Sequence, residues 1–297
     1  MILNEEKRKK NWDKTYTESK DIEKSDTDLL IVVPTLGRED KQRAIYQFPE
    51  SFRDRIFLVT KESHSELLKE KNPGFNVLSI SDETNGIAET RQKCLDILPK
   101  GKIWMIDDMV KFQCRNDDGR VTGHITEEEL VDLYNTISEG LDTYPQIGIS
   151  ARQVNNTFME FKKDVGRCYS TYGLRSDVME KENVRFDGLF SKNENIKLYE
   201  DYYVTLKLFS KGYSNTILFE WIFNHSHNKP GGNSSFRTNQ TQIDSAEGIQ
   251  TEFGKNYISI KVIESYWKDM NTRPEVTIKW KKFFEDSLKK VTTKSLF

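Results

Sequence analysis

The chain contains 297 residues, of which 36% are hydrophobic and 31% are charged, and its net charge is −2. This composition excludes a disordered chain and predicts a globular protein with a highly charged surface and a substantial core. No apolar run approaches the roughly 18 residues of a membrane-spanning helix. Residues 1–10 lack the apolar centre of a signal peptide, and the few cysteines are scattered, so we expect a cytoplasmic location.

Strands and helices are predicted to alternate through the first third of the chain. Strands are expected at residues 29–34, 56–59, 76–80 and 103–106, with helices at 41–47 and 64–70 and a loop followed by a helix within 84–98 between them. This alternation predicts an α/β fold with a mostly parallel central sheet and helices on both faces. Ligands should then bind at the carboxyl ends of the strands, where residues 35–38, 81–91 and 107–108 follow.

The second half of the chain contains further elements in a less regular order. A helix is expected at residues 126–141, opened by Thr126 and three glutamates, and another from Glu200 to Phe209. Strands are expected at 147–150 and 215–223, whereas the aromatic segment 158–174 is predicted to be irregular.

We divide the chain into an N-terminal charged arm (1–28), a catalytic domain (29–240) and a helical, basic and aromatic C-terminal extension (241–297). Residues 253–297 contain ten Lys and Arg against five Asp and Glu, with aromatic residues interleaved. Such a stretch can follow a nucleic-acid backbone. It can equally be a basic amphipathic helix packed on the domain.

Asp107 and Asp108 directly follow the apolar strand Ile103–Ile106. Neighbouring carboxylates repel each other unless a cation lies between them, and Mg²⁺ and Mn²⁺ prefer oxygen ligands. The pair therefore indicates a site for a divalent metal and a diphosphate. The alternative is a solvated turn at the end of a strand.

Several segments together resemble the GT-A glycosyltransferases. Val32–Arg38 resembles their first nucleotide-binding loop, and Gly86–Gln92 resembles their second nucleotide-contacting segment. Ile106-Asp107-Asp108 is similar to their metal-binding DXD motif. Glu200-Asp201, which begins a helix, resembles the acidic pair that carries the base in inverting members. The resemblance implies a GT-A-like (Rossmann-like) fold.

More narrowly, the chain resembles the TET-associated glycosyltransferase family, whose phage and eukaryotic relatives place sugars on hydroxymethylated pyrimidines in DNA. The residues that carry this resemblance are Gly148–Arg152 with Asn155 and Asn156, and Gly231-Gly232 followed by Arg237. It implies a nucleotide-sugar donor, expected to be a UDP-sugar, Mn²⁺ or Mg²⁺ as the metal, and hydroxymethylated DNA as the acceptor. If the chain is phage-encoded, its expected location is the host cytoplasm.

The resemblance also implies roles for individual residues. Met109 stands where relatives often carry a third acid, so Asp108 would bind the metal either together with Asp107 or with Asp107 on the ribose, and His225 or His227 would complete the metal's ligands. Asp201, backed by Glu200, would be the catalytic base, or would position the acceptor in a retaining enzyme. The residues expected at the donor are Pro34, Thr35, Gly37, Arg38, Gly86, Arg91, Asp107, Gly231, Gly232 and Arg237.

Each of these roles has a structural alternative. The arginines could form surface salt bridges, the histidines could be inert, and acids in the first turn of a helix are often only favourable partners of its dipole. A base extruded from DNA would stack on aromatic rings, for which Tyr169, Tyr172 and Phe158 are candidates, unless these residues belong to the core.

Two other functions remain open. The acceptor could be a glycan, a lipid or a protein, although no membrane-binding helix is evident. The chain could also be a catalytically silent module that binds a nucleotide or DNA. Replacing Asp108 with Asn would abolish turnover in an enzyme and change nothing in a silent module.

Overall fold

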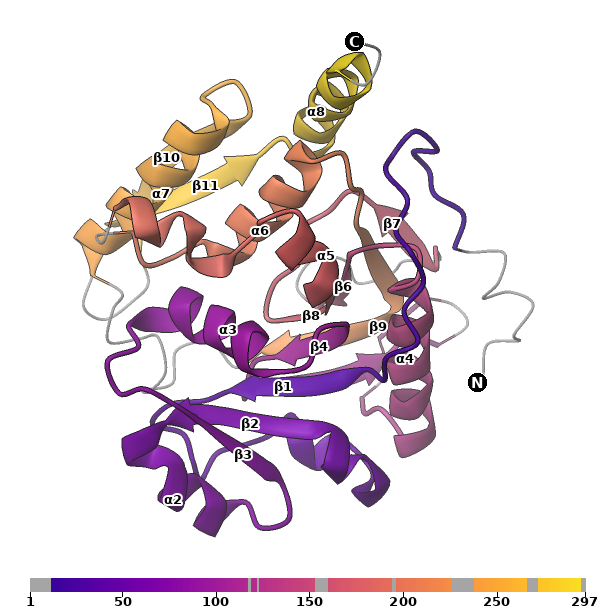
Figure 1. The fold of residues 1–297 in the computed structure, drawn as a ribbon, viewed down its shortest axis with the longest axis vertical. Coiled ribbons are helices and arrows are strands. Elements are labelled where there is room, and N and C mark those ends of the chain that lie inside the picture. The colour runs from indigo at the N-terminus through magenta and orange to yellow at the C-terminus, as the bar shows by residue number, and fades with distance from the viewer. Residues whose placement is uncertain are drawn as a thin grey trace.

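A nine-stranded sheet runs through the middle of the protein (Figure 1) in this computed structural model, which describes residues 12–116, 119–121, 123–152, 160–193, 196–225, 238–265 and 272–294. The strands lie in the order β3-β2-β1-β4-β8-β6-β9-β5, and β7 pairs with β9 outside this path. In chain order they are β1 (Leu30–Pro34), β2 (Ile56–Lys61), β3 (Asn76–Ile80), β4 (Lys102–Ile106), β5 (Val110–Cys114), β6 (Gln146–Ala151), β7 (Lys162–Asp164), β8 (Thr171–Arg175) and β9 (Thr216–His225). β5, β7 and β8 run opposite to the other six strands, so the expected mostly parallel sheet is confirmed.

Helices cover both faces of this sheet, as the sequence predicts. They are α2 (Glu62–Lys71), α3 (Gly86–Ile97), α4 (Glu127–Gly140), α5 (Ser176–Lys181), α6 (Glu200–Ser210), α7 (Asn239–Phe253) and α8 (Trp280–Lys294). Short 3-10 helices lie at Ile45–Gln47, Glu50–Arg55, Phe186–Gly188 and Phe190–Lys192. The expected helix after Thr126 begins with a capping box, in which Thr126 and Glu129 each bond the other's backbone N–H.

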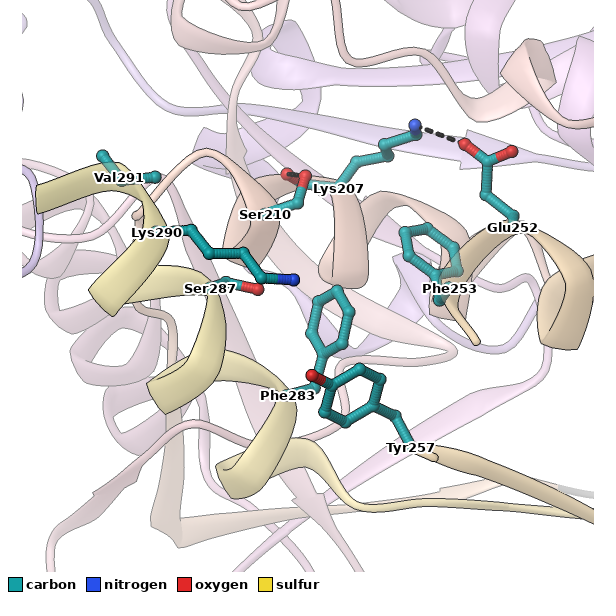
Figure 2. Close-up of a pocket in the computed structure, with 9 residues that line it drawn as sticks. All are labelled: Lys207, Ser210, Glu252, Phe253, Tyr257, Phe283, Ser287, Lys290 and Val291. Carbon is teal, nitrogen blue, oxygen red and sulfur yellow. Dashed lines mark hydrogen bonds and ion pairs between the residues drawn. The ribbon is translucent and has the colours of Figure 1, made fainter. Parts of the chain in front are cut away.

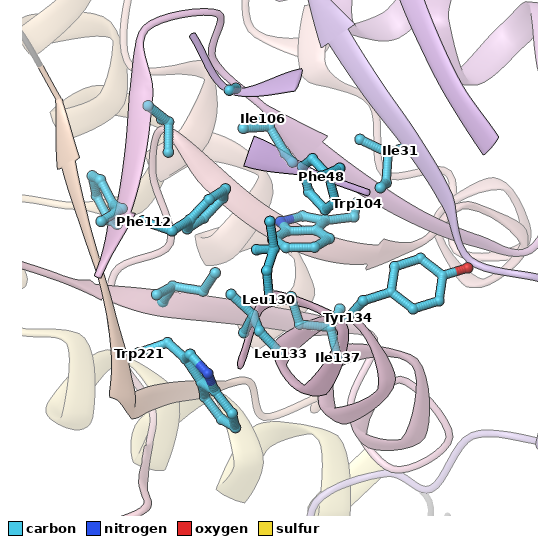
Figure 3. Packing of buried hydrophobic residues seen from close by; sticks show 14 of the residues in the cluster. Ile31, Phe48, Trp104, Ile106, Phe112, Leu130, Leu133, Tyr134, Ile137 and Trp221 are labelled. Carbon is cyan, nitrogen blue, oxygen red and sulfur yellow. The ribbon is translucent and has the colours of Figure 1, made fainter. Parts of the chain in front are cut away.

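Strand β4 shows why the central strands are apolar along their whole length. Successive side chains of a strand point to opposite faces. Trp104 and Ile106 pack into the core beneath α4 (Figure 3), whereas Ile103 and Met105 pack into a second core that includes residues of α3 and α6. All five residues of β4 are buried. The expectation of a strand buried on both faces is therefore confirmed, and the strand's end is held rigidly.

Two predictions about local structure were wrong. The segment 158–174 is not irregular throughout its described part, because β7 and β8 lie in it and β8 pairs with both β4 and β6. The helix expected at 41–47 is reduced to one 3-10 turn. Two backbone N–H groups of this segment do not form helical hydrogen bonds, because those of Arg43 and Ala44 both donate to the carbonyl oxygen of Asp108. That contact holds the first loop against the end of β4.

The C-terminal extension contains the expected helices, α7 and α8, and also an antiparallel hairpin of β10 (Ile258–Glu264) and β11 (Thr272–Ile278). Phe283 and Phe284 of α8 are buried in a third core with Phe209 of α6. These aromatic residues therefore follow the packed-helix alternative. Within the described chain, no helix is long and apolar enough to cross a membrane.

Candidate functional site

The site is built on the three-residue turn that joins β4 to β5. The backbone N–H of Asp107 donates to the carbonyl oxygen of Ser170 at 2.8 Å, and the N–H of Val110 donates back to Asp107 at 3.1 Å. Ser170 has a φ of +57°, which is uncommon for a residue other than glycine. Met109 turns its side chain into the core. Asp107 is thus fixed at the carboxyl end of a central strand, where ligands of α/β sheets bind.

Arg91 of α3 connects Asp107 to the start of α6. Its Nη2 lies 2.7 Å from Asp107 Oδ1, and its Nη1 lies 2.6 Å from Glu200 Oε1. The guanidinium also lies over the ring of Tyr172, 5.5 Å from its centroid. The Arg91 side chain is 5% exposed, so both charge-assisted hydrogen bonds form away from water. His225 completes this cluster, with Nε2 3.8 Å from Asp107 Oδ2.

Asp108 faces a different set of partners from Asp107. Its Oδ1 lies 3.0 Å from Arg38 Nη1, and its Oδ2 accepts a hydrogen bond from the Thr35 hydroxyl at 3.2 Å. Burial raises the pKa of Asp108, and the attraction of Arg38 opposes that rise. Gln42, which the sequence interpretation missed, donates to Thr35 Oγ1 at 2.7 Å and to the Arg38 carbonyl at 2.9 Å. The first loop is therefore tied to Asp108.

Glu200 and Asp201 occupy the first turn of α6. Burial raises the pKa of Glu200 to about 7, because the nearby acids add to the desolvation while Arg91 only partly offsets it. The helix follows Tyr199, whose φ of +68° is a second strained position at the site. Asp201 Oδ1 accepts a hydrogen bond from the Tyr202 N–H at 2.9 Å. The acid pair is therefore split, with Glu200 turned inward.

Arg167 is a further residue at the site that the sequence interpretation missed. Its Nη2 lies 3.6 Å from Asp201 Oδ2. Its guanidinium lies 4.0 Å from the ring centroid of Tyr169 and 4.4 Å from that of Tyr202. No local pattern marks Arg167: Tyr169 lies two residues away, but Asp201 and Tyr202 come from α6, far along the chain. The hint was only that Arg167 lies in the aromatic segment 158–174.

The structure brings most of the predicted residues to one edge of the sheet. Pro34, Thr35, Gly37 and Arg38 end β1 and form the first loop, and Gly86 begins α3 with a φ of +81°. Tyr172 is fully buried, so its prediction as a platform for an extruded base was wrong. The remaining predicted residues lie outside the described residues: His227, Gly231, Gly232, Arg237, Asn155, Asn156 and Phe158.

The donor atoms at Asp107 suit a divalent cation only in part. Among the described residues, no group of three or more His, Cys, Asp or Glu side chains is placed to hold a metal ion. Asp107 Oδ2 and His225 Nε2 lie 3.8 Å apart, and ligands about 2.0–2.2 Å from one ion are separated by roughly 3–4 Å. Mg²⁺ usually takes one or two carboxylates together with substrate phosphates. Asp107 and His225 therefore fit a cation whose other ligands come from a diphosphate.

The protein has a mostly parallel sheet with arginines and acids gathered at the carboxyl ends of its strands. It belongs to the class of nucleotide-sugar-dependent glycosyltransferases of the GT-A type. The comparison with known families identifies the family within this class. The model of the family described as TET-Associated Glycosyltransferase matches residues 29–232, and the chain belongs to this family.

Two curated relatives share most of their length with the chain. The beta-glucosyl-HMC-alpha-glucosyl-transferase of Enterobacteria phage T6 is 25% identical over 259 residues, covering 82% of this chain and 85% of the relative. The enzyme of the same name from phage T2 is 23% identical over 255 residues, with the same coverage. Among solved structures, S. aureus TarS in complex with UDP-GlcNAc is similar with a TM-score of 0.45 and 15% identity, over 75% of this chain and 67% of TarS.

Proposed function

We propose that this glycosyltransferase moves a sugar from a UDP-sugar to a hydroxyl group on a hydroxymethylated pyrimidine in DNA, with Mn²⁺ or Mg²⁺ at Asp107. The acceptor hydroxyl belongs either to the hydroxymethyl group or to a sugar already attached to it. The names of the phage relatives, which refer to beta-glucosyl-HMC, support this acceptor. The family match supports the nucleotide-sugar donor.

One observation carries the proposal: Arg91 binds Asp107 and Glu200 at once, with His225 beside Asp107. This contact joins α3, the end of β4 and the start of α6 at the edge of the sheet where a donor would bind. A bound divalent cation neutralises the charge that develops on the leaving nucleoside diphosphate. Asp107 and His225 would hold that cation, and Arg38 would add positive charge near the phosphates.

Asp201 would act on the acceptor. In an inverting reaction the acceptor oxygen bonds to the anomeric carbon, the bond from that carbon to the diphosphate breaks, and Asp201 receives the hydroxyl proton. Arg167 holds the Asp201 carboxylate in place, 3.6 Å away. In a retaining reaction Asp201 orients the acceptor hydroxyl without taking its proton. The anomeric configuration of the product distinguishes the two roles.

The test is transfer to defined DNA. The protein is incubated with UDP-glucose or another UDP-sugar, with Mn²⁺ or Mg²⁺, and with duplex DNA that contains cytosine, hydroxymethylcytosine or glucosylated hydroxymethylcytosine. Nucleosides from the digested DNA are then weighed by mass spectrometry. We expect a sugar on one of the two modified bases only, and loss of transfer when EDTA removes the metal.

Asp107→Asn is the informative variant. Removing the charge that would hold the cation is expected to lower the transfer rate about 100-fold or more. Asp21→Asn is the matched control, because the Asp21 side chain is 93% exposed and its ion pair with Lys14 lies outside the site. Undiminished transfer by Asp107→Asn contradicts the metal assignment. Transfer to a glycan, lipid or protein with none to DNA contradicts the acceptor.

A further inference from the structure

A cavity of about 310 Å³ lies in the C-terminal half of the protein (Figure 2), and Asp107 is not among the residues that line it. Helices α6, α7 and α8 form its walls, and the start of β10 borders it. Its volume is at the lower end of the range of roughly 300–1,000 Å³ that is typical of small-molecule sites. It can therefore hold one ring system with a charged group, but not a duplex.

The charge inside the cavity is positive. Glu252 accepts hydrogen bonds from two lysines, Lys207 at 2.5 Å and Lys192 at 2.7 Å, so its two oxygens are both used. Lys290 also lines the cavity, and no carboxylate in the described part of the chain lies within ion-pair distance of it. Among the described residues that line the cavity, Lys207 and Lys290 thus carry two positive charges against the one negative charge of Glu252, and Lys290 is the ammonium group left without a carboxylate. An anionic ligand would restore the balance of charge.

Helix α8 presents the other binding groups in a single stripe. Phe283, Ser287 and Lys290 are spaced at helical intervals and face the cavity together (Figure 2). No partner for the Ser287 hydroxyl lies among the residues that the structure describes. The rings of Phe253 and Tyr257 meet Phe283 edge to face, with centroids 5.6 and 5.1 Å away. An ammonium, a hydroxyl and aromatic rings in one cavity are the groups that bind a nucleotide of a single strand.

We propose that this cavity binds one nucleotide of the acceptor DNA strand, with its phosphate on Lys290 and Ser287 and its base or sugar against Phe283. The assignment rests on the proposed function, which makes DNA the acceptor. Helix α6 connects the cavity with the proposed catalytic site, since Lys207 at the cavity follows Glu200 at the site by seven residues, about 10 Å along the helix axis. One strand of DNA can span that distance, so the cavity would hold a nucleotide near the one that receives the sugar.

The first experiment measures the binding of a fluorescent four-nucleotide single strand without modified bases. Lys290→Gln is expected to weaken binding about tenfold, because one charge-assisted hydrogen bond is lost. The slope of log affinity against log salt should fall by about 0.7. Lys290→Arg, which retains the charge, should restore most of the affinity. Lys289→Gln is the matched control on the exposed neighbouring position, which does not line the cavity, and should change affinity less than about twofold.

The second experiment separates a DNA nucleotide from a free one. Thymidine monophosphate, inorganic phosphate and UDP compete with the labelled strand in the wild-type protein and in Lys290→Gln. Weak competition by all three, with strand binding that depends on Lys290, supports the assignment. Competition by UDP or the monophosphate that is stronger than by an unlabelled strand overturns it in favour of a free-nucleotide site.

The failure of this assignment is distinguishable from the failure of the proposed function. If modified DNA receives sugar and Lys290→Gln binds the strand as tightly as Lys289→Gln does, the cavity assignment is overturned and the transfer stands. If Lys290→Gln loses strand binding but no DNA base receives sugar under any donor, the acceptor proposal fails, and the cavity is then a site for single-stranded DNA that is not an acceptor.

Discussion

Glu200 and Asp201 are neighbours in the chain, yet each is paired with a different arginine in a different environment. Glu200 faces inward to Arg91, whose side chain is 5% exposed and also binds Asp107. Asp201 faces Arg167, whose side chain is 40% exposed and lies between two tyrosine rings. The first turn of α6 therefore borders both the interior of the protein and the open side of the site.

The difference shows how one acidic pair can serve two purposes. A buried charge without its partner is costly, so the Arg91 cluster fixes three elements in one arrangement. The Arg167–Asp201 pair is open to solvent on the Arg167 side only, since the Asp201 side chain is 13% exposed. A partly screened ion pair contributes less to stability than a buried one, so this pair can change when a substrate arrives. We call Arg91–Glu200 the inner pair and Arg167–Asp201 the outer pair. We therefore expect the inner pair to contribute most to the free energy of unfolding and the outer pair to contribute most to the reaction of the acceptor.

The largest effect is expected from Arg91→Met. This change leaves Asp107 and the buried Glu200 without their shared cation, and it should lower the free energy of unfolding by roughly 3–5 kcal/mol. Urea unfolding at pH 7.5, followed by circular dichroism, measures the loss. The cost should shrink near pH 5, because the pKa of Glu200 is raised to about 7 and the lone carboxyl can take up a proton there.

Arg185→Met is the control for this prediction, since Arg185 pairs with Asp187 and Asp96 on a side chain that is 44% exposed. Its loss should cost about 1 kcal/mol or less. Equal losses in the two variants would remove the distinction between the inner and outer pairs. The double variant Arg91→Met/Glu200→Gln should recover part of the loss, because the unpaired carboxylate is then gone.

The inner cluster also shows what the sequence can and cannot predict. The strand before Asp107 was predictable, because a strand buried on both faces must be apolar throughout. Arg91 was predictable as a site residue from its place after a strand. Its bond to Glu200 was not, because the two residues are 109 positions apart and only the packing of α3 and α6 around the 3-10 helix Phe186–Gly188 brings them together.

The missed strands have different causes. β8 is short and contains Gly173, and a side chain there would meet Ile137 of α4 at 2.7 Å, so packing removed the usual apolar signal. β10 carried a signal that was overlooked. Ile258, Ile260 and Val262 alternate with polar residues, which is the pattern of a half-buried strand. The basic charge of the extension favoured a helical interpretation instead.

An intermediate effect is expected from Glu200→Gln. The pKa of Glu200 is about 7 in the folded protein, whereas the ordinary value for a glutamate is 4.5. The folded protein therefore binds this proton more tightly than the unfolded chain does. The resulting stabilisation is complete below pH 4.5 and is lost as the pH rises through 7. The difference in unfolding free energy between wild type and Glu200→Gln should therefore fall by on the order of 2 kcal/mol across this interval.

Urea titrations at half-unit pH steps measure this difference. Glu66→Gln is the matched control, because it removes a carboxylate whose side chain is 88% exposed and shows the effect of one surface charge alone. A difference for Glu200→Gln that stays flat between pH 4.5 and 7, or that rises, would contradict the burial of a carboxyl whose desolvation Arg91 only partly offsets.

The smallest effect on stability is expected from Arg167→Met, about 1 kcal/mol or less, because Arg167 is 40% exposed, lies 3.6 Å from Asp201, and is replaced by a thioether that still packs between the tyrosines. Its effect on the reaction should be larger. Without Arg167 the Asp201 carboxylate can rotate, and a misplaced base costs about 10- to 100-fold in kcat. The rise in melting temperature that UDP produces should stay unchanged, because Arg167 does not touch the first loop. A variant that loses UDP binding and kcat together would place Arg167 at the donor, and the outer pair would then serve the same substrate as the inner one.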